Sequence, residues 1–193
     1  DLDGDERVDI AAADADSSTL VIFLQTGGGA FAEAPRVPSG EDPTALAAAD
    51  LDRDGREDIV VTSGSVFGGS SRVSLLFGRS GGGFSAPVVV SAGSLPNAVL
   101  AADLDNDEAP DLAVTNELSG DLAVLLNDGN GVFGEPATYD VGVSPVALTA
   151  ADLDGDRFLD LAVTNSGTGA IGILLNRGDG TFQEAARHEV TGF

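Results

Sequence analysis

The chain of 193 residues contains no cysteine, no tryptophan and no methionine, and only one histidine and one tyrosine. The lack of cysteine excludes disulfides, zinc–thiolate sites and thiol nucleophiles. A single histidine leaves few arrangements for nucleophilic or zinc-dependent catalysis, so the sequence predicts a protein that is not an enzyme. The lack of tryptophan also weighs against a lectin, because sugar faces commonly stack on aromatic rings.

Basic residues and long apolar runs are also scarce. The chain carries 9 Lys and Arg against 32 Asp and Glu, which gives a formal net charge of −23. Such a surface repels nucleic acid and anionic lipid, so neither is a predicted partner. No stretch approaches ~20 apolar residues, so membrane insertion is not predicted. The chain begins at Asp1 and lacks methionine, which predicts a processed product or a fragment.

Half of the acidic residues lie in four copies of one nine-residue pattern, Asp-x-Asp-x-Asp-x-x-x-Asp, which start 49, 53 and 49 residues apart. Carboxylates this close repel one another unless a cation lies among them. Hard oxygen ligands in a short loop suit calcium, whereas an EF-hand or dockerin-like site would need flanking helices. Solvated acidic turns without metal are the simpler alternative. The pattern comprises Asp1, Asp3, Asp5, Asp9, Asp50, Asp52, Asp54, Asp58, Asp103, Asp105, Asp107, Asp111, Asp152, Asp154, Asp156 and Asp160.

The whole chain is an array of repeats, which we place at residues 1–44, 45–97, 98–146 and 147–193 of a single domain, 1–193. Each repeat holds apolar runs of five to seven residues bounded by Gly, Asp, Asn and Pro, which predicts strands. The alanine-rich runs are ambiguous but too short for stable helices. Four strands in about 49 residues match one propeller blade. The sequence therefore predicts an all-β propeller of about four blades of four antiparallel strands, alone or as part of a larger propeller.

Two further sets of residues recur in the repeats. Phe31, Phe84, Phe133 and Phe182 occupy one equivalent position after glycine-rich turns, and we interpret them as core residues rather than a ligand-stacking set. The asparagines that follow Ala-Val-Thr, at positions 116 and 165, are interpreted as turn caps rather than glycan contacts. The first repeat lacks the alanine-rich run, so about 15 strands are expected.

The unit ADLDGD-x-x-x-DLAVTN, followed by VLLN-x-G-x-G-x-F, resembles the FG-GAP/VCBS repeat, which builds the β-propeller of integrin α subunits. The resemblance extends over essentially the whole chain. It implies that each acidic loop joins the first two strands of a blade and holds one calcium ion, up to four in all. It also implies ligands from the aspartates at positions 1, 3, 5 and 9, and from the backbone carbonyl at position 7. Position 7 is occupied by Arg7, Arg56, Ala109 and Phe158.

The family commonly places glycine at positions 4 and 6, where tight turns can require a positive φ. The first and fourth loops have Gly4 and Gly155 at position 4, and the second has Gly55 at position 6. The third loop has Asn106 and Glu108 there instead, so we expect it to be the weakest site. The first site is also expected to be impaired, because Asp1 lacks a preceding strand.

The resemblance implies a calcium-stabilised scaffold, extracellular or on a cell surface, that presents loops to a protein or glycan partner. Three alternatives remain open: a lectin-like module, an accessory domain of a secreted polysaccharide-acting enzyme, and a structural repeat of a surface filament. Self-association could complete the propeller.

Overall fold

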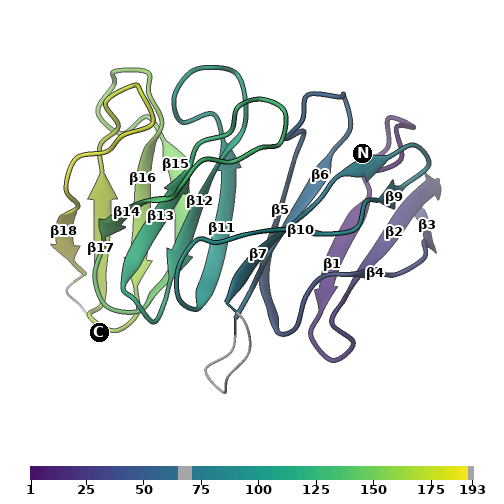
Figure 1. The fold of residues 1–193 in the computed structure, drawn as a ribbon, viewed down its shortest axis with the longest axis horizontal. Coiled ribbons are helices and arrows are strands. Elements are labelled where there is room, and N and C mark those ends of the chain that lie inside the picture. Colours follow the sequence, from purple (N-terminus) through teal and green to yellow (C-terminus); the bar gives the residue numbers. More distant parts are fainter. Residues whose placement is uncertain (65–70, 191–193) are drawn as a thin grey trace.

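The computed structural model describes residues 1–64 and 71–190, and every regular element within these ranges is a β-strand. The strands form four main sheets that stand side by side along the molecule (Figure 1). The second repeat is four residues longer than the third, and the sequence places this insertion within residues 63–71, most of which lie outside the described residues. In the described part of the chain, no helix could serve as a membrane span.

Three of the sheets are complete blades of four antiparallel strands in chain order. The second blade contains β5 (Pro43–Ala49), β6 (Asp58–Ser63), β7 (Arg72–Leu76) and β10 (Val88–Val90). The third contains β11 (Pro96–Ala102), β12 (Asp111–Asn116), β13 (Asp121–Leu125) and β14 (Ala137–Asp140). The fourth contains β15 (Pro145–Ala151), β16 (Asp160–Asn165), β17 (Ala170–Leu174) and β18 (Ala186–Glu189). Each first strand begins two residues before the repeat boundary placed from the sequence.

Among the described residues, no strand occupies the inner position of the first blade, as the sequence predicts. This blade consists of β1 (Ile10–Asp14), β2 (Thr19–Gly27) and β4 (Val37–Pro38), with β3 (Ala30–Glu33) paired to the far end of β2. A similar short hairpin in the second blade comprises β8 (Gly78–Arg79) and β9 (Gly83–Phe84). When the short hairpin strands β3, β8 and β9 are left out, fifteen of the eighteen described strands remain, and these build the blades, as expected.

The alanine-rich runs form the inner strands β5, β11 and β15. The middle strand, β11, lies against both of the others, so the inner strands of successive blades are neighbours. Pairing in a sheet therefore overrides the high helix propensity of alanine in runs this short. Each inner strand starts with a proline, and the pairing register shifts directly after it. Proline has no backbone N–H to donate, and the first position of a strand tolerates this loss.

Three apolar cores fill the spaces between neighbouring blades. Between the second and third blades, for example, Leu51 and Leu75 pack with Leu112 and Leu125. The second strands β6 and β12 are buried along their whole length, which explains their continuous apolar runs. Each blade therefore depends on its neighbours for burial.

Three of the four recurring phenylalanines pack into these cores. Phe182 is 2% exposed, and Phe84 and Phe133 are partly buried against neighbouring core residues. Phe31 is 43% exposed. The interpretation as core residues fails at Phe31, because no blade of the described residues covers that face of the first blade.

Candidate metal centres

The acidic loops of the complete blades join the first and second strands, as the resemblance implied. In the third blade the loop leaves β11 and enters β12, and Ala102 pairs with Asp111 across the ladder. The equivalent pairs are Ala49 with Asp58 and Ala151 with Asp160. Strand pairing thus holds both ends of each of these loops together.

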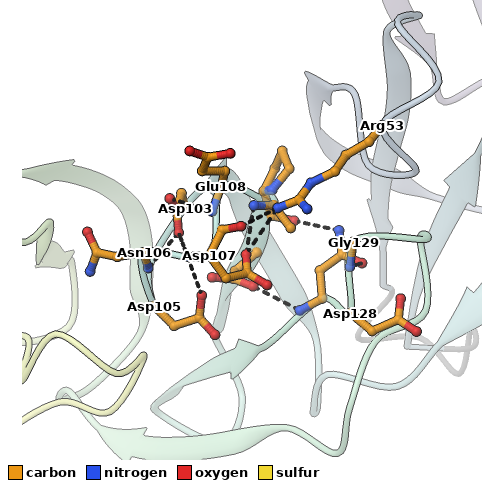
Figure 2. Close-up of polar contacts among 12 residues, drawn as sticks. Arg53, Asp103, Asp105, Asn106, Asp107, Glu108, Asp128 and Gly129 are labelled. Atoms are coloured by element: carbon orange, nitrogen blue, oxygen red, sulfur yellow. Dashed lines mark hydrogen bonds and ion pairs between the residues drawn. The ribbon is translucent and has the colours of Figure 1, made fainter.

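The first aspartate of each loop folds the loop around its own carboxylate. In the third loop, Asp103 accepts hydrogen bonds from the backbone N–H groups of Asn106 (2.7 Å), Asp107 (3.2 Å) and Glu108 (3.0 Å) (Figure 2). Asp1 and Asp152 likewise accept bonds from the backbone N–H groups at positions 4 and 6 of the first and fourth loops. Aspartate commonly forms such local turns, so the shape of the loop by itself accounts for the recurring aspartate at the first position.

The backbone at positions 4 and 6 is left-handed in all four loops, which confirms the requirement inferred from glycine. The φ angles at position 4 are 85° at Gly4, 57° at Arg53, 65° at Asn106 and 88° at Gly155. Those at position 6 are 67° at Glu6, 84° at Gly55, 70° at Glu108 and 80° at Arg157. Only the third loop meets both requirements without glycine, at a backbone cost of roughly 1–2 kcal/mol for a residue such as glutamate.

The ninth-position aspartate fastens the loop to the blade. Asp111 accepts one hydrogen bond from the N–H of Leu104 and another from the N–H of Asn127, each 2.8 Å long. The equivalent aspartates Asp58 and Asp160 are also buried and make the same two kinds of bond. Burial raises the pKa of Asp58 and of Asp111 to about 6, despite these hydrogen bonds.

Each loop brings three carboxylates together, with one oxygen from each within 4.8 Å of the others. In the second, third and fourth loops they come from positions 1, 3 and 9, whereas in the first loop they come from positions 1, 3 and 5. The four groups are Asp1, Asp3 and Asp5; Asp50, Asp52 and Asp58; Asp103, Asp105 and Asp111; and Asp152, Asp154 and Asp160.

The third-position carboxylates carry a further sign of an unbalanced charge. Oδ1 of Asp52 is buried and accepts no hydrogen bond. The pKa of Asp52 is raised mainly by burial and then by the negative charge of Asp54. The pKa of Asp105 is raised mainly by burial and then by the negative charge of Asp107. At Asp14, by contrast, a hydrogen bond from Ser17 lowers the pKa. Clustered, partly desolvated carboxylates with an unused oxygen fit a divalent cation, and all-oxygen donors of this kind fit calcium.

Positions 5 and 7 differ between the loops. Asp5 forms an ion pair with Arg7, and Asp54 forms one with Arg56. The carboxylate of Asp107 instead lies 3.4 Å from Arg53 of the preceding loop (Figure 2). Asp54, Asp107 and Asp156 lie outside the three-carboxylate groups of their loops. Their part in metal binding, and that of the seventh-position carbonyls, stays a prediction.

The role of the asparagine that follows the third strand of two blades was not predicted from the sequence. The side-chain amide of Asn127 donates to the carbonyls of Leu51 (2.8 Å) and Pro110 (3.0 Å), which belong to the second and third loops. Asn176 links the third and fourth loops in the same way, through Leu104 (2.8 Å) and Leu159 (3.0 Å). The recurrence of Leu-Leu-Asn was the available signal.

In the second, third and fourth blades, the glycine-rich turn packs against the acidic loop of the preceding blade. A Cβ atom at Gly180 would lie 3.1 Å from Cβ of Asp105 and 2.6 Å from the side chain of Leu126. A Cβ atom at Gly131 would lie 3.5 Å from Cβ of Asp52. The missing side chains of these glycines therefore allow each blade to pack closely against the acidic loop of the preceding blade.

Asn116 and Asn165 are buried and serve the fold. Their side-chain amides donate to the carbonyls of Ala92 (2.7 Å) and Val141 (2.9 Å). Asn116 is 0% exposed and Asn165 2% exposed, which leaves no surface for a glycan.

Comparison with protein families gives one match: the model described as FG-GAP-like repeat matches residues 1–61, 103–163 and 152–193. No curated protein is similar enough to match the chain.

The solved structures that share the fold include a lectin and BBS1N. A lectin from Agrocybe aegerita, which recognises non-reducing terminal N-acetylglucosamine, has a TM-score of 0.63 and 21% identity over 97% of this chain and 50% of its own. BBS1N, solved in complex with ARL6DN, has a TM-score of 0.65 and 16% identity over 98% of this chain and 55% of its own. The chain thus spans about half the length of these structures.

Proposed function

Because the chain belongs to the FG-GAP-like repeat family, we propose that it is a calcium-binding β-propeller module that acts as a non-catalytic, extracellular scaffold for a protein or glycan partner. The observation that carries the proposal is the recurrence of three close carboxylates in all four acidic loops.

Calcium has a structural role in this proposal. An ion bound at each loop would offset the mutual repulsion of carboxylates that the fold forces together. The loops in turn contact the next blade, through Asn127 and Asn176 and through the packed glycine turns. Calcium binding is therefore expected to stabilise the stacking of blades, and its free energy becomes part of the free energy of folding.

A non-catalytic role is supported by where the reactive groups lie. The ninth-position carboxylates are bonded to backbone N–H groups, and His188 lies exposed on the outer strand β18. For an extracellular module of this kind, the expected Kd for calcium is roughly 10⁻⁴ to 10⁻³ M.

Thermal unfolding in calcium, in magnesium and in chelator tests the proposal. We expect a large loss of stability in chelator that calcium restores and magnesium does not. Asp154→Ala should reproduce part of this loss in calcium, and Asp156→Ala tests the predicted fifth-position ligand. Asp16→Ala, in an exposed turn outside the loops, is the matched control and should behave as the wild type. Identical melting curves with and without chelator would refute calcium binding.

Glycan binding is a second candidate for the partner. A cleft of about 640 Å³ lies between the outer strands β14 and β18 and is lined by polar side chains that include Thr138, Asp140, Glu184 and Arg187. The lectin with the same fold supports this candidate. A glycan array would test it: binding that free sugar competes away and that Arg187→Ala abolishes would identify the cleft as the site.

A further inference from the structure

Two clefts between the third and fourth blades, both complete sheets of four strands, meet at one ion pair. The first is the cleft of about 640 Å³ between β14 and β18. The second, of about 370 Å³, lies beside the β12–β13 turn and the segment that links β14 to β15. Asp140 and Arg187 line both clefts, and their side chains pair at 2.6 Å. The clefts therefore form one groove, here called the outer groove, which consists of residues 117–120, 138–140, 142–144, 184, 185 and 187.

One end of the outer groove carries two exposed apolar side chains. Leu118 in the β12–β13 turn is 73% exposed, and Val143 in the link to β15 is 57% exposed. Neither belongs to the three apolar cores between the blades, so packing of the fold does not account for them. The equivalent positions of other repeats hold polar residues or glycine, namely Asp16, Glu41, Ser94 and Gly167. Neighbouring exposed apolar side chains in a cleft are typical of a binding surface.

The walls of the outer groove are acidic. Glu117, Asp140 and Glu184 line it together with one basic residue, Arg187, which gives a formal charge of −2 from three carboxylates and one guanidinium. The side-chain amide of Asn97 donates a hydrogen bond of 3.0 Å to the carboxylate of Glu117 and so holds it in place. Arg187 is already paired with Asp140, whose side chain is 81% exposed. The groove therefore attracts cationic ligands and repels anionic ones.

The backbone on both sides of the first cleft also favours an extended peptide. β14 pairs with β13, and β18 pairs with β17, so among the described strands each of these outer strands is paired on one edge only. Unpaired backbone N–H and C=O groups at such an edge can bond to an extended chain.

We propose that the outer groove binds an extended peptide segment of a partner protein, and that this segment combines a lysine or arginine with a bulky apolar residue. The apolar side chain packs against Leu118 and Val143, and the cation lies near Asp140 and Glu184. This inference deepens the proposed function, on which it rests, because it gives the chemistry of the protein partner. It also separates the partner from the metal centres, since β12 runs from the acidic loop at one end of the blade to the β12–β13 turn at the other.

A selection from displayed random octapeptides tests the proposal in saturating calcium. Peptides are selected on the wild type and counter-selected on the double variant Leu118→Ser, Val143→Ser, and the enriched peptides are labelled for fluorescence polarisation. We expect them to combine lysine or arginine with a large apolar residue, and to bind Leu118→Ser alone about fivefold or more weakly than the wild type. Val132→Ser changes a valine that is 62% exposed in a glycine-rich turn outside the groove, so it is the matched control and should bind as the wild type.

The charge of the groove is tested with the same labelled peptides. Glu184→Gln should weaken binding by about two- to fivefold, as expected for a solvent-exposed ion pair. Glu135→Gln is the matched control, because Glu135 occupies the equivalent position in the preceding blade and lies outside the groove. The substituted side chains of both variants are exposed, so their melting curves should match that of the wild type.

Three results would overturn the proposal. The first is no enrichment of any peptide over the double variant, and the second is enriched peptides without a cationic residue or with equal responses to Glu184→Gln and Glu135→Gln. The third is a glycan that binds in an array and loses binding in Leu118→Ser, which would assign the groove to a sugar. If chelator leaves the melting curve unchanged, calcium binding fails and the peptide assay still decides the groove. If chelator destabilises the protein but no peptide is enriched, only the groove proposal fails.

Discussion

The side-chain amide of Asn127 donates a 2.8 Å hydrogen bond to the backbone carbonyl of Leu51, a residue 76 positions earlier in the chain. The bond joins the end of the third strand of one blade to the acidic loop of the preceding blade. Both residues are buried, so neither group has water as an alternative partner.

Replacing Asn127 with alanine should therefore weaken the contact between blades. Two carbonyls, those of Leu51 and Pro110, would lose their donor, and the expected loss is about 2–3 kcal/mol in the free energy of unfolding. Denaturant unfolding in calcium measures it. Asn130→Ala, an exposed neighbour in the same turn, is the control and should change stability by less than about 0.5 kcal/mol. Equal effects of both substitutions would contradict the role of Asn127.

The glycine turn offers a second test of blade stacking. Gly180→Ala should destabilise the protein, because the added Cβ meets Leu126 at 2.6 Å in addition to the cost of a φ of 73°. Gly169 is the matched control, since its φ is 64° and an added Cβ has no neighbour within 4 Å. Gly169→Ala should cost about 1 kcal/mol and Gly180→Ala about 2–3 kcal/mol or more. Thermal unfolding of the pair measures the difference, and similar melting temperatures would show that the turn does not pack closely in solution.

The acidic loops could be predicted from the sequence because their hydrogen bonds are local. Asp103 accepts its bonds from residues three to five positions later, so the spacing alone reports the turn. The strands could be predicted because the apolar runs are too short for stable helices and are bounded by turn-forming residues. This holds even for the alanine-rich β15. The link from Asn127 to Leu51 could not be predicted, because it depends on how one blade stacks on the next.

Which aspartates of a loop come together could not be predicted from their spacing, because it depends on contacts with other side chains. The predicted fifth-position ligand Asp54 pairs with Arg56, and Asp107 is contacted by Arg53 from the neighbouring loop. Phe31 repeats the sequence position of Phe182, but among the described residues Phe182 packs into the core shared with the preceding blade and Phe31 does not.

The dependence of stability on pH should reverse when calcium is removed. Burial raises the pKa of Asp58 and of Asp111 from 3.8 to about 6, so the folded, chelated chain binds protons at these carboxyls more tightly than the unfolded chain does. Their contribution is fully present below pH 3.8 and is lost as the pH rises through about 6. In chelator, the melting temperature should therefore fall between pH 4 and pH 7.

In calcium the sign should be opposite, because the metal binds only the deprotonated carboxylates. The melting temperature should then rise with pH over the same range. Asp111→Asn is the informative variant, since it should flatten both profiles. Parallel profiles in calcium and in chelator would show that these buried carboxyls do not take part in metal binding.

Glu108→Gly tests whether backbone strain limits the third metal centre. Glu108 has a φ of 70° at a position where the second loop has Gly55, and the third loop is the only one with no glycine at either left-handed position. Glycine removes a cost of roughly 1–2 kcal/mol but adds freedom to the unfolded chain, so the expected net gain is about 0.5–1 kcal/mol in the free energy of unfolding. Glu108→Gln keeps the strain and removes only the charge, so it separates the two effects.

The calcium affinity of the third site should rise in the same glycine variant. The loop would then reach its binding conformation without strain, and a gain of 0.5–1 kcal/mol corresponds to about a two- to fivefold lower Kd. Calcium titration of Glu108→Gly, Glu108→Gln and the wild type measures it. If the glutamine variant gains as much affinity as the glycine variant, the charge of Glu108 and not the backbone limits the site, and the expectation that this loop is weakened by its missing glycines is wrong.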